Sequence, residues 1–148
     1  MRILLSYVGD RPKEKAIREL FDLYLKRATR YLDVTEKSFS STEKLLSFVE
    51  TQRAANSLRC IFCDPRGKLV SSEDIAEVVE KAALSGVKQL LVAIGPANGW
   101  TEQQRVLADQ LISLGRITLP HELCLLILME QVYRALTIRA GHPYHSGH

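Results

Sequence analysis

The pattern of apolar and polar positions predicts strands that alternate with helices along the whole chain. Short, nearly continuous apolar runs are typical of strands that are covered on both faces of a sheet. Such runs occupy residues 2–8, 58–64 and 88–95, and each is followed by glycine, proline or polar turn residues. The half-polar segment 32–39 and the segment 111–119 predict two further strands.

The segments between these strands carry helix signals. Apolar residues recur at helical spacing from residue 17 to residue 28, which predicts a helix that starts near Pro12. Ser41 or Thr42 is placed to cap a second helix. A third helix is predicted over residues 71–86, because a serine precedes it, acidic residues fill its first turn and a glycine follows its last turn.

The remaining segments predict two turns and two helices. PRGK, residues 65–68, and PANGW, residues 96–100, are interpreted as turns. A polar helix starts near Thr101, and Pro120 opens a last helix that extends to about Ala140. Strands that alternate with helices predict one α/β domain over residues 1–148, with a mostly parallel sheet and helices on both faces.

The last predicted helix is apolar on nearly every side. Residues 123–129 read LCLLILM, and the apolar residues continue with Val132, Tyr133, Ala135, Leu136 and Ile138. A helix that is hydrophobic all round has to be buried all round. Because a small domain offers little to cover it, we predict a symmetric homodimer.

Length and composition are those of an ordinary globular domain, with 148 residues, 46% of them apolar and 25% charged. The net charge of +3 is a weak argument for nucleic acid, although residues 11–30 hold seven basic residues against three acidic ones. We expect no signal peptide ahead of the first strand, and the run 123–129 is too short to cross a bilayer. An odd count of three cysteines does not suggest a disulfide framework. These features predict a cytoplasmic protein with no membrane partner.

Two short motifs are candidates for chemistry. Cys60 and Cys63 form a C-x-x-C pair, but they lie in a predicted strand without a second pair, so we interpret them as buried apolar side chains and not as a redox or zinc site. Gly95 stands in IGPANG, which matches neither common nucleotide-binding motif. It follows a central strand, where open α/β sheets bind ligands.

The C-terminal tail, residues 141–148, reads GHPYHSGH and holds three of the four histidines: His142, His145 and His148. A metal site, a cloning remnant and part of a working site all remain open from this pattern alone. Pro143 and the glycines prevent a helical alignment of the imidazoles, and the tail contains no Cys, Asp or Glu to complete a metal site. We therefore expect no metal.

Four segments, in order and with matching spacing over essentially the whole chain, point to one family. They are LYLKRATRY, DPRGKLVSSEDIA, AIGPANGW and ITLPHELCLLILMEQVYRALTIRAGHPYH. Together they resemble the bacterial family of methyltransferases that modify N3 of a pseudouridine in large-subunit ribosomal RNA, within the SPOUT or α/β-knot superfamily. The resemblance implies a C-terminal trefoil knot, a homodimer, S-adenosylmethionine as methyl donor and assembled ribosomes as the substrate.

The resemblance also implies a cofactor site made from three backbone-rich loops. By position, these loops contain Cys63, Gly95, Leu114, Gly115, Arg116, Ile117, Thr118 and Leu119. Main-chain amides and carbonyls in such loops can read an adenine edge while apolar side chains hold its face. This chain departs from the family at Pro96, where a second glycine is usual, and proline has no N–H to offer a cofactor. Cys63 replaces the leucine that is common at its position.

In the family, the tail lies at the mouth of the cofactor pocket and near the dimer interface. The resemblance therefore implies that His145 and Tyr144 are catalytic, with His145 or a water accepting the N3 proton and Tyr144 stacking on the base or donating to its carbonyl. RNA contacts are expected from Arg27, Arg30, His121, Arg134 and His142. Two alternatives remain: a non-catalytic RNA- or ribosome-binding protein with the same fold, which Pro96 favours, and a metal-dependent enzyme that uses the tail histidines.

Overall fold

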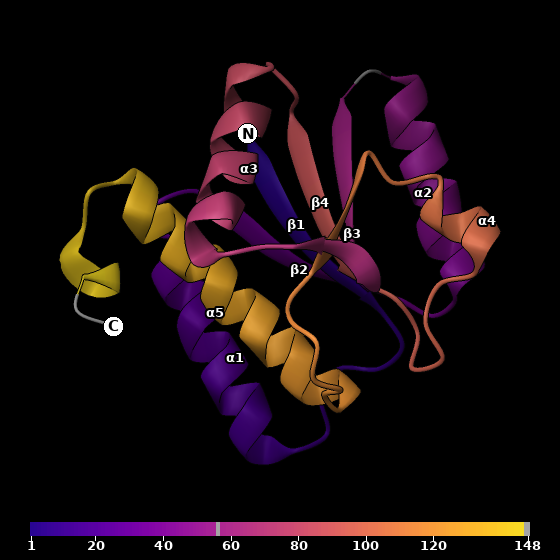
Figure 1. The fold of residues 1–148 in the computed structure, drawn as a ribbon, viewed down its shortest axis with the longest axis horizontal. Coiled ribbons are helices and arrows are strands. Elements are labelled where there is room, and N and C mark those ends of the chain that lie inside the picture. The colour runs from indigo at the N-terminus through magenta and orange to yellow at the C-terminus, as the bar shows by residue number, and fades with distance from the viewer. Residues whose placement is uncertain (56, 147–148) are drawn as a thin grey trace.

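A computed structural model gives the fold of residues 1–55 and 57–146. His148 lies outside these described residues. In chain order the elements are β1 (Arg2–Val8), α1 (Lys15–Ala28), β2 (Asp33–Phe39), α2 (Thr42–Ala54), β3 (Leu58–Leu69), α3 (Ser72–Leu84), β4 (Gln89–Ile94), α4 (Glu102–Arg105), β5 (Gln110–Ser113), α5 (His121–Arg139) and the 3-10 turn η1 (Pro143–His145). This alternation of strands and helices confirms the predicted α/β class (Figure 1).

The strands form a five-stranded sheet in the order β2-β1-β4-β3-β5. Each of its neighbouring pairs is parallel, which confirms the predicted sheet type. Side chains that alternate along β1 enter two separate cores. Ile3, Leu5 and Tyr7 pack with α1, α3 and α5 on one face, whereas Leu4 and Val8 pack with α2 on the other. The sheet is therefore covered on both faces, as its apolar strands require.

The helix ends confirm the expected caps. Ser41, and not Thr42, caps α2, since its hydroxyl accepts a hydrogen bond from the backbone N–H of Lys44. Ser71 and Asp74 form a reciprocal capping box at the start of α3. Gly86 follows the end of that helix with φ +80°, a conformation that favours glycine.

Strand β3 is longer than its sequence predicted. It continues to Leu69, so the segment 65–68 is part of the strand and the predicted turn there is wrong. Ile112 of β5 pairs with Cys63 and again with Lys68, and the residues between those two positions bulge out of the ladder. Proline and glycine are tolerated at such bulges because they interrupt no ladder hydrogen bond.

Gly67 lies where two distant chain segments come closest. A Cβ atom at Gly67 would stand 2.7 Å from the backbone nitrogen of Ile112 and 2.7 Å from the carbonyl carbon of Leu111. Only glycine permits this passage of β5 across β3. A knotted chain needs close passages of this kind, and the trefoil knot itself stays a prediction.

Strand β5 is shorter than predicted, because it ends at Ser113 and the segment 114–119 is a loop. The Ser113 hydroxyl accepts a hydrogen bond from the N–H of Gly115 at 3.3 Å and donates to its carbonyl at 3.0 Å. Gly115 has φ +145°, which turns the chain away from the sheet. The predicted polar helix is also short, since α4 is a single turn of four residues.

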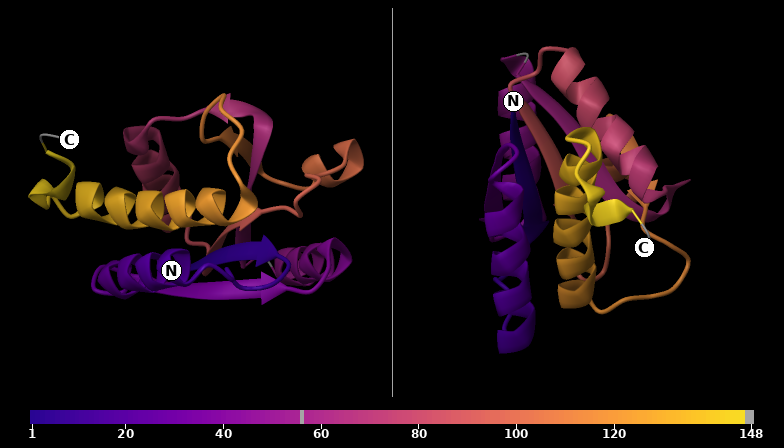
Figure 2. Two further views of the ribbon diagram at one scale, coloured as in Figure 1. Left: turned by 90° about the horizontal axis from the view of Figure 1, so that it is seen from below. Right: turned by 90° about the vertical axis from the view of Figure 1, so that its left-hand side faces the viewer.

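Helix α5 packs against both α1 and α3, and Figure 2 shows it running alongside them. In the single chain the helix is not enclosed, because Leu123 on its outer side is 39% exposed. Leu20 and Leu23 of the neighbouring α1 are similarly exposed. Among the described residues, no helix combines the length and hydropathy that crossing a membrane requires.

Candidate functional site

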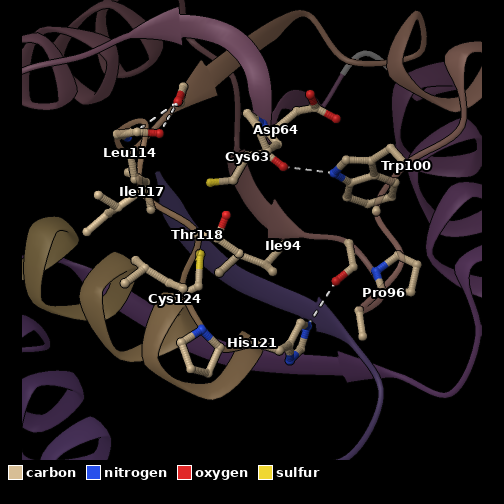
Figure 3. Close-up of a pocket in the computed structure, with 18 of the residues that line it drawn as sticks. Cys63, Asp64, Ile94, Pro96, Trp100, Leu114, Ile117, Thr118, His121 and Cys124 are labelled. Atoms are coloured by element: carbon tan, nitrogen blue, oxygen red, sulfur yellow. Dashed lines mark hydrogen bonds between the residues drawn. The ribbon is translucent and has the colours of Figure 1, made fainter.

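A cavity opens beside the carboxyl end of β4. Its volume of about 640 Å³ is within the usual range for small-molecule sites. The cavity is lined by all eight residues predicted to bind the cofactor: Cys63, Gly95, Leu114, Gly115, Arg116, Ile117, Thr118 and Leu119 (Figure 3). Three segments that are far apart in the sequence therefore meet around one space. Their role as cofactor ligands stays a prediction.

The walls of the cavity are mainly apolar. Ile94 closes one side, and Ile117, which is 77% exposed, stands at the opening. Asp64 and Arg116 are the charged residues among those that line it. The Asp64 carboxylate accepts a hydrogen bond from the backbone N–H of Arg66 at 2.8 Å, which shapes the chain directly after Cys63.

Two side chains bind the main chain of the cavity wall. The Trp100 ring stacks on Phe62, with centroids 4.0 Å apart, and its Nε1–H donates to the carbonyl of Cys63 at 3.0 Å. His121 Nε2 lies 2.9 Å from the carbonyl of Gly95. A carbonyl can only accept, so His121 carries its hydrogen on Nε2. His121 lines the cavity, and its predicted contact with RNA stays a prediction.

The three cysteines are free thiols. Burial raises the pKa of Cys60 to about 12, and burial likewise raises the pKa of Cys63 and Cys124. All three are therefore protonated at neutral pH and are poor nucleophiles or metal ligands. Among the described residues, no group of three or more His, Cys, Asp or Glu side chains is arranged to hold a metal ion.

A second polar cluster forms at the other end of α5. Arg134 binds Glu130 one turn earlier, with Nη2 2.7 Å from Oε1. Tyr144 of the tail donates its hydroxyl to the same Glu130 oxygen at 2.9 Å, and the Arg134 guanidinium lies 4.7 Å from the centre of the Tyr144 ring. Burial, with the hydrogen bond to Glu130, raises the pKa of Tyr144 above its ordinary value. The phenol is therefore a hydrogen-bond donor and not a base.

Both ring nitrogens of His145 are engaged in this cluster. Nδ1 lies 3.0 Å from Arg134 Nη1, and Nε2 lies 2.7 Å from Glu73 Oε1 at the start of α3. A guanidinium can only donate, so Nδ1 is the acceptor and Nε2 carries the hydrogen that is given to Glu73. In this arrangement His145 has no free lone pair with which to take a proton from a substrate.

Within one chain, the tail does not lie at the mouth of the cavity. The family resemblance placed it there and near a dimer interface, and this placement in a dimer stays a prediction. The cavity includes His121 at the first residue of α5, whereas the tail follows the last. At 1.5 Å per residue, the 19 residues of α5 separate the two ends by about 28 Å. Figure 2 shows the tail and the loop before α5 at opposite ends of the helix. The described residues of the tail are absent from the cavity lining.

The other residues predicted to contact RNA gather at the tail end of α5. The His142 ring meets the edge of Tyr31, just beyond α1, with centroids 6.3 Å apart. Arg27 and Arg30 lie at this end of α1, and the Arg27 guanidinium is 5.6 Å from the ring centre of Tyr24. The structure thus brings four of the five residues together: Arg27, Arg30, Arg134 and His142.

Comparisons with known proteins identify the family. A family model described as Predicted SPOUT methyltransferase matches residues 1–145. The chain belongs to the SPOUT methyltransferase family. Two relatives, each named Ribosomal RNA large subunit methyltransferase H, come from Koribacter versatilis and Deinococcus radiodurans. The first is 41% identical over all of both chains, and the second is 42% identical over 99% of this chain and 100% of its own.

Solved structures share the fold of this chain at low sequence identity. A probable methylase family protein from Haemophilus influenzae superposes on 99% of this chain and 70% of its own, with a TM-score of 0.52 and 10% identity. The SpoU methyltransferase AviRb from Streptomyces viridochromogenes, in complex with AdoMet, has a TM-score of 0.50 and 12% identity. That match covers 95% of this chain and 61% of AviRb. These likenesses support the fold of this SPOUT methyltransferase and nothing finer.

The sequence did not single out several residues that line the cavity of this SPOUT methyltransferase, among them Asp64, Trp100 and Cys124. Trp100 had a usable signal, because it is the chain's only tryptophan and it directly follows the PANG turn after a central strand. Asp64 follows Cys63 at the end of an apolar run, which is a common place for a loop-shaping carboxylate. Cys124 had no such signal, since it lies in an apolar run of a helix.

Proposed function

We propose that this SPOUT methyltransferase transfers a methyl group from S-adenosylmethionine to N3 of a pseudouridine in large-subunit ribosomal RNA, as a single-domain homodimer acting on assembled ribosomes in the cytoplasm. One observation carries the proposal: the eight residues that the family resemblance assigns to the cofactor site all line one cavity. The relatives named as ribosomal RNA large subunit methyltransferases, which match over full length, support the class of RNA.

The cavity suits S-adenosylmethionine in size and in chemistry. Its walls combine apolar side chains, such as Ile94 and Leu114, with main-chain groups of the loop 114–119. This is the usual combination for holding the face of a base and reading its edge. When bound there, the cofactor would supply a methyl group already activated on a sulfonium. The protein's own task would then be to align the acceptor nitrogen with that methyl group.

A second protomer would bring the tail to the cavity. The symmetric dimers that predominate among oligomers have a two-fold axis. An axis that crosses α5 near its middle reverses the direction of the helix, so the tail of one protomer would lie beside the cavity of its partner. The exposed leucines of α1 and α5, Leu20, Leu23 and Leu123, would contribute apolar contacts to such an interface.

His145 is proposed as the group that accepts the N3 proton, after its contact with Arg134 opens. The imide proton must leave before N3 attacks the methyl group, and the only lone pair of His145 is occupied by Arg134 in the free chain. RNA phosphate is a strong competitor for a guanidinium. When RNA draws Arg134 away, Nδ1 becomes available, and the face of the Tyr144 ring that the guanidinium covers is free to stack on the base.

The test is methyl transfer from labelled S-adenosylmethionine to intact ribosomes, separated subunits and protein-free RNA, each lacking the endogenous modification. We expect label on one pseudouridine of assembled ribosomes. His145→Ala should lower the rate by a factor of about 10² to 10⁴, the usual contribution of a general base. Lys44→Ala, on the exposed side of α2, is the matched control and should leave the rate unchanged. Equal rates for the two variants would show that His145 does not accept the N3 proton.

The non-catalytic alternative has one specific observation in its favour. Pro96 lines the cavity and offers no N–H, so this wall has one main-chain donor fewer than the family pattern. A pure binder would associate with ribosomes and show no calorimetric affinity for S-adenosylmethionine or for its demethylated product, with or without RNA. The metal-dependent alternative predicts loss of methyl transfer in a chelator selective for transition metals that leaves the Mg²⁺ of the ribosomes in place, whereas the proposed mechanism predicts full activity.

A further inference from the structure

In two of the three segments around the cavity, a backbone carbonyl oxygen accepts a hydrogen bond from a side-chain N–H group of another segment. Trp100 donates to the carbonyl of Cys63 at 3.0 Å, and His121 donates to the carbonyl of Gly95 at 2.9 Å (Figure 3). Each hydrogen bond joins elements that are distant in sequence, namely β3 with the segment after β4, and β4 with the start of α5. The backbone orientation of both loops is therefore fixed from outside the loops themselves.

We propose that Trp100 and His121 are positioning residues, which hold the main chain at Cys63 and Gly95 in the orientation that binds the cofactor. The inference deepens the proposed function, since it rests on this cavity being the S-adenosylmethionine site. A site built from main-chain groups depends on how those groups are held, and a few tenths of an ångström decide its affinity.

Trp100 differs from an ordinary core side chain, because it packs in the core and also lines the cavity. The indole is 5% exposed and lines the cavity, while its inner face stacks on Phe62 at an interplanar angle of 6°. A Cβ atom at Gly95 would stand 2.8 Å from the indole ring, so the ring is the reason that this position is glycine. Trp100 thus sets the position of Gly95 by contact and that of Cys63 by hydrogen bond.

The segment between Gly95 and Trp100 has little freedom of its own. The N–H of Gly99 donates to the carbonyl of Pro96 at 2.8 Å and closes a turn, and Arg105 Nη1 binds the carbonyl of Trp100 at 3.1 Å. Proline at residue 96 fixes one further backbone angle. With His121 holding Gly95 at one end, the turn is anchored at both ends. Loss of either anchor therefore changes the wall of the cavity through the main chain at Cys63 or Gly95.

The experiment compares three variants of the full-length protein: His121→Leu, His121→Gln and Trp100→Phe. Leucine removes the donor to Gly95, whereas the glutamine amide keeps a donor near the position of Nε2. Phenylalanine keeps an aromatic ring that can stack on Phe62 and removes the N–H together with one ring of the indole, so its change in thermal stability is compared with its change in affinity. Calorimetry with S-adenosylmethionine and with its demethylated product measures affinity, thermal denaturation measures stability, and methyl transfer to ribosomes gives kcat and KM.

We expect His121→Leu and Trp100→Phe to weaken cofactor binding by roughly three- to tenfold, the effect of one lost hydrogen bond. His121→Gln should restore the affinity to within about twofold of the unaltered protein, since a donor is retained. The loss should appear in KM for the cofactor, with kcat at saturation unchanged, because neither side chain is placed to touch the reacting atoms.

Equal affinity in all variants, with only a lower melting temperature, would overturn the inference and leave both residues a structural role. Equal losses for His121→Leu and His121→Gln would overturn it for His121. A fall in kcat with an unchanged KM would overturn positioning for the residue concerned. Failure of the proposed function would look different: the unaltered protein itself would bind no S-adenosylmethionine, and the inference would fail with it.

Discussion

The two ends of α5 are built in different ways. At its first residue, the helix meets a cavity whose shape comes from main chain: a strand crossing at Gly67, a bulge in β3 and the loop 114–119. At its last residue, the helix meets a tail held by side chains, through Glu130, Arg134 and Glu73. Backbone geometry is fixed by the fold, whereas ion pairs and hydrogen bonds at a surface are exchanged at small cost.

This difference suggests a division of labour between the two ends. A site that must fit the same small molecule in every cycle benefits from a backbone that cannot rearrange. A segment that must meet a ribosome and move a proton benefits from contacts that RNA can replace. The comparison can be tested by substitutions at each end, because backbone collisions should be costly and the loss of side-chain contacts should be cheaper.

Gly67→Ala should have the largest effect. The new Cβ would collide with the backbone of Leu111 and Ile112, at 2.7 Å, and backbone cannot rotate away as a side chain can. We expect the free energy of unfolding to fall by about 3 kcal/mol or more, at the upper end for overpacking. Chemical denaturation measures it. Lys68→Ala, one residue further along and exposed, is the control and should change stability little. A small effect of Gly67→Ala would show that β5 can move away from β3.

Gly95→Ala should come next and should act mainly on the cavity. Its Cβ would stand 2.8 Å from the Trp100 ring, which stacks on Phe62 and has little room to retreat. We expect about 1–3 kcal/mol of destabilisation and at least a tenfold loss of S-adenosylmethionine affinity, since overpacking displaces the loop. Calorimetry and denaturation together measure both effects. Asn98→Ser, at an exposed position of the same turn that does not line the cavity, should retain affinity. Unchanged affinity in Gly95→Ala would mean that the loop can move away from the Trp100 ring without weakening cofactor binding.

The sequence predicted most of the fold because buried strands and capped helices leave local signals. Apolar runs gave the places of β1, β3 and β4, and Ser71 with Gly86 gave both ends of α3. The wrong predictions, a turn at residues 65–68 and a longer β5, concern places where distant chain segments meet. No local pattern reveals that β5 pairs on both sides of a bulge in β3, or that Ser113 ends its strand by bonding Gly115.

The candidate site was predictable in its parts but not in its arrangement. Residues from three loops were named through the family resemblance, and the fold does bring them together. The roles of His121 and Trp100 depend on pairings with carbonyls far away in sequence, at Gly95 and Cys63, which no periodicity can encode. His145 has the right chemistry for a base, yet only the structure shows that Arg134 and Glu73 occupy its two nitrogens.

Arg134→Met should have a smaller effect on stability, because it removes exchangeable contacts. The side chain of Arg134 is 15% exposed and that of Glu130 is 18% exposed, so the pair is partly screened by water. We expect about 1 kcal/mol of destabilisation by denaturation, the typical value of a hydrogen-bonded interaction. Arg139→Met is the matched control on the same helix, since its partner Glu80 is 48% exposed, and it should cost less. A loss as large as that of Gly67→Ala would contradict the proposed difference between the two ends.

Of the changes considered, the smallest should be the shift that His145→Ala causes in the pKa of Glu73. The hydrogen bond from His145 lowers the pKa of this exposed carboxyl. The ionised Glu73 therefore stabilises the docked tail at pH values above the ordinary carboxyl range, and this stabilisation is lost as the pH falls through the lowered pKa. His145→Ala should raise the pKa of Glu73 toward its ordinary value, measured by carbon NMR titration of the side-chain carboxyl. Asp74 is a neighbouring control, because its pKa is lowered by Ser71 and not by His145. If Asp74 shifts with Glu73, the cap of α3 has changed. If neither shifts, the tail is not docked on α3 in solution, and RNA has no contact with Glu73 to displace.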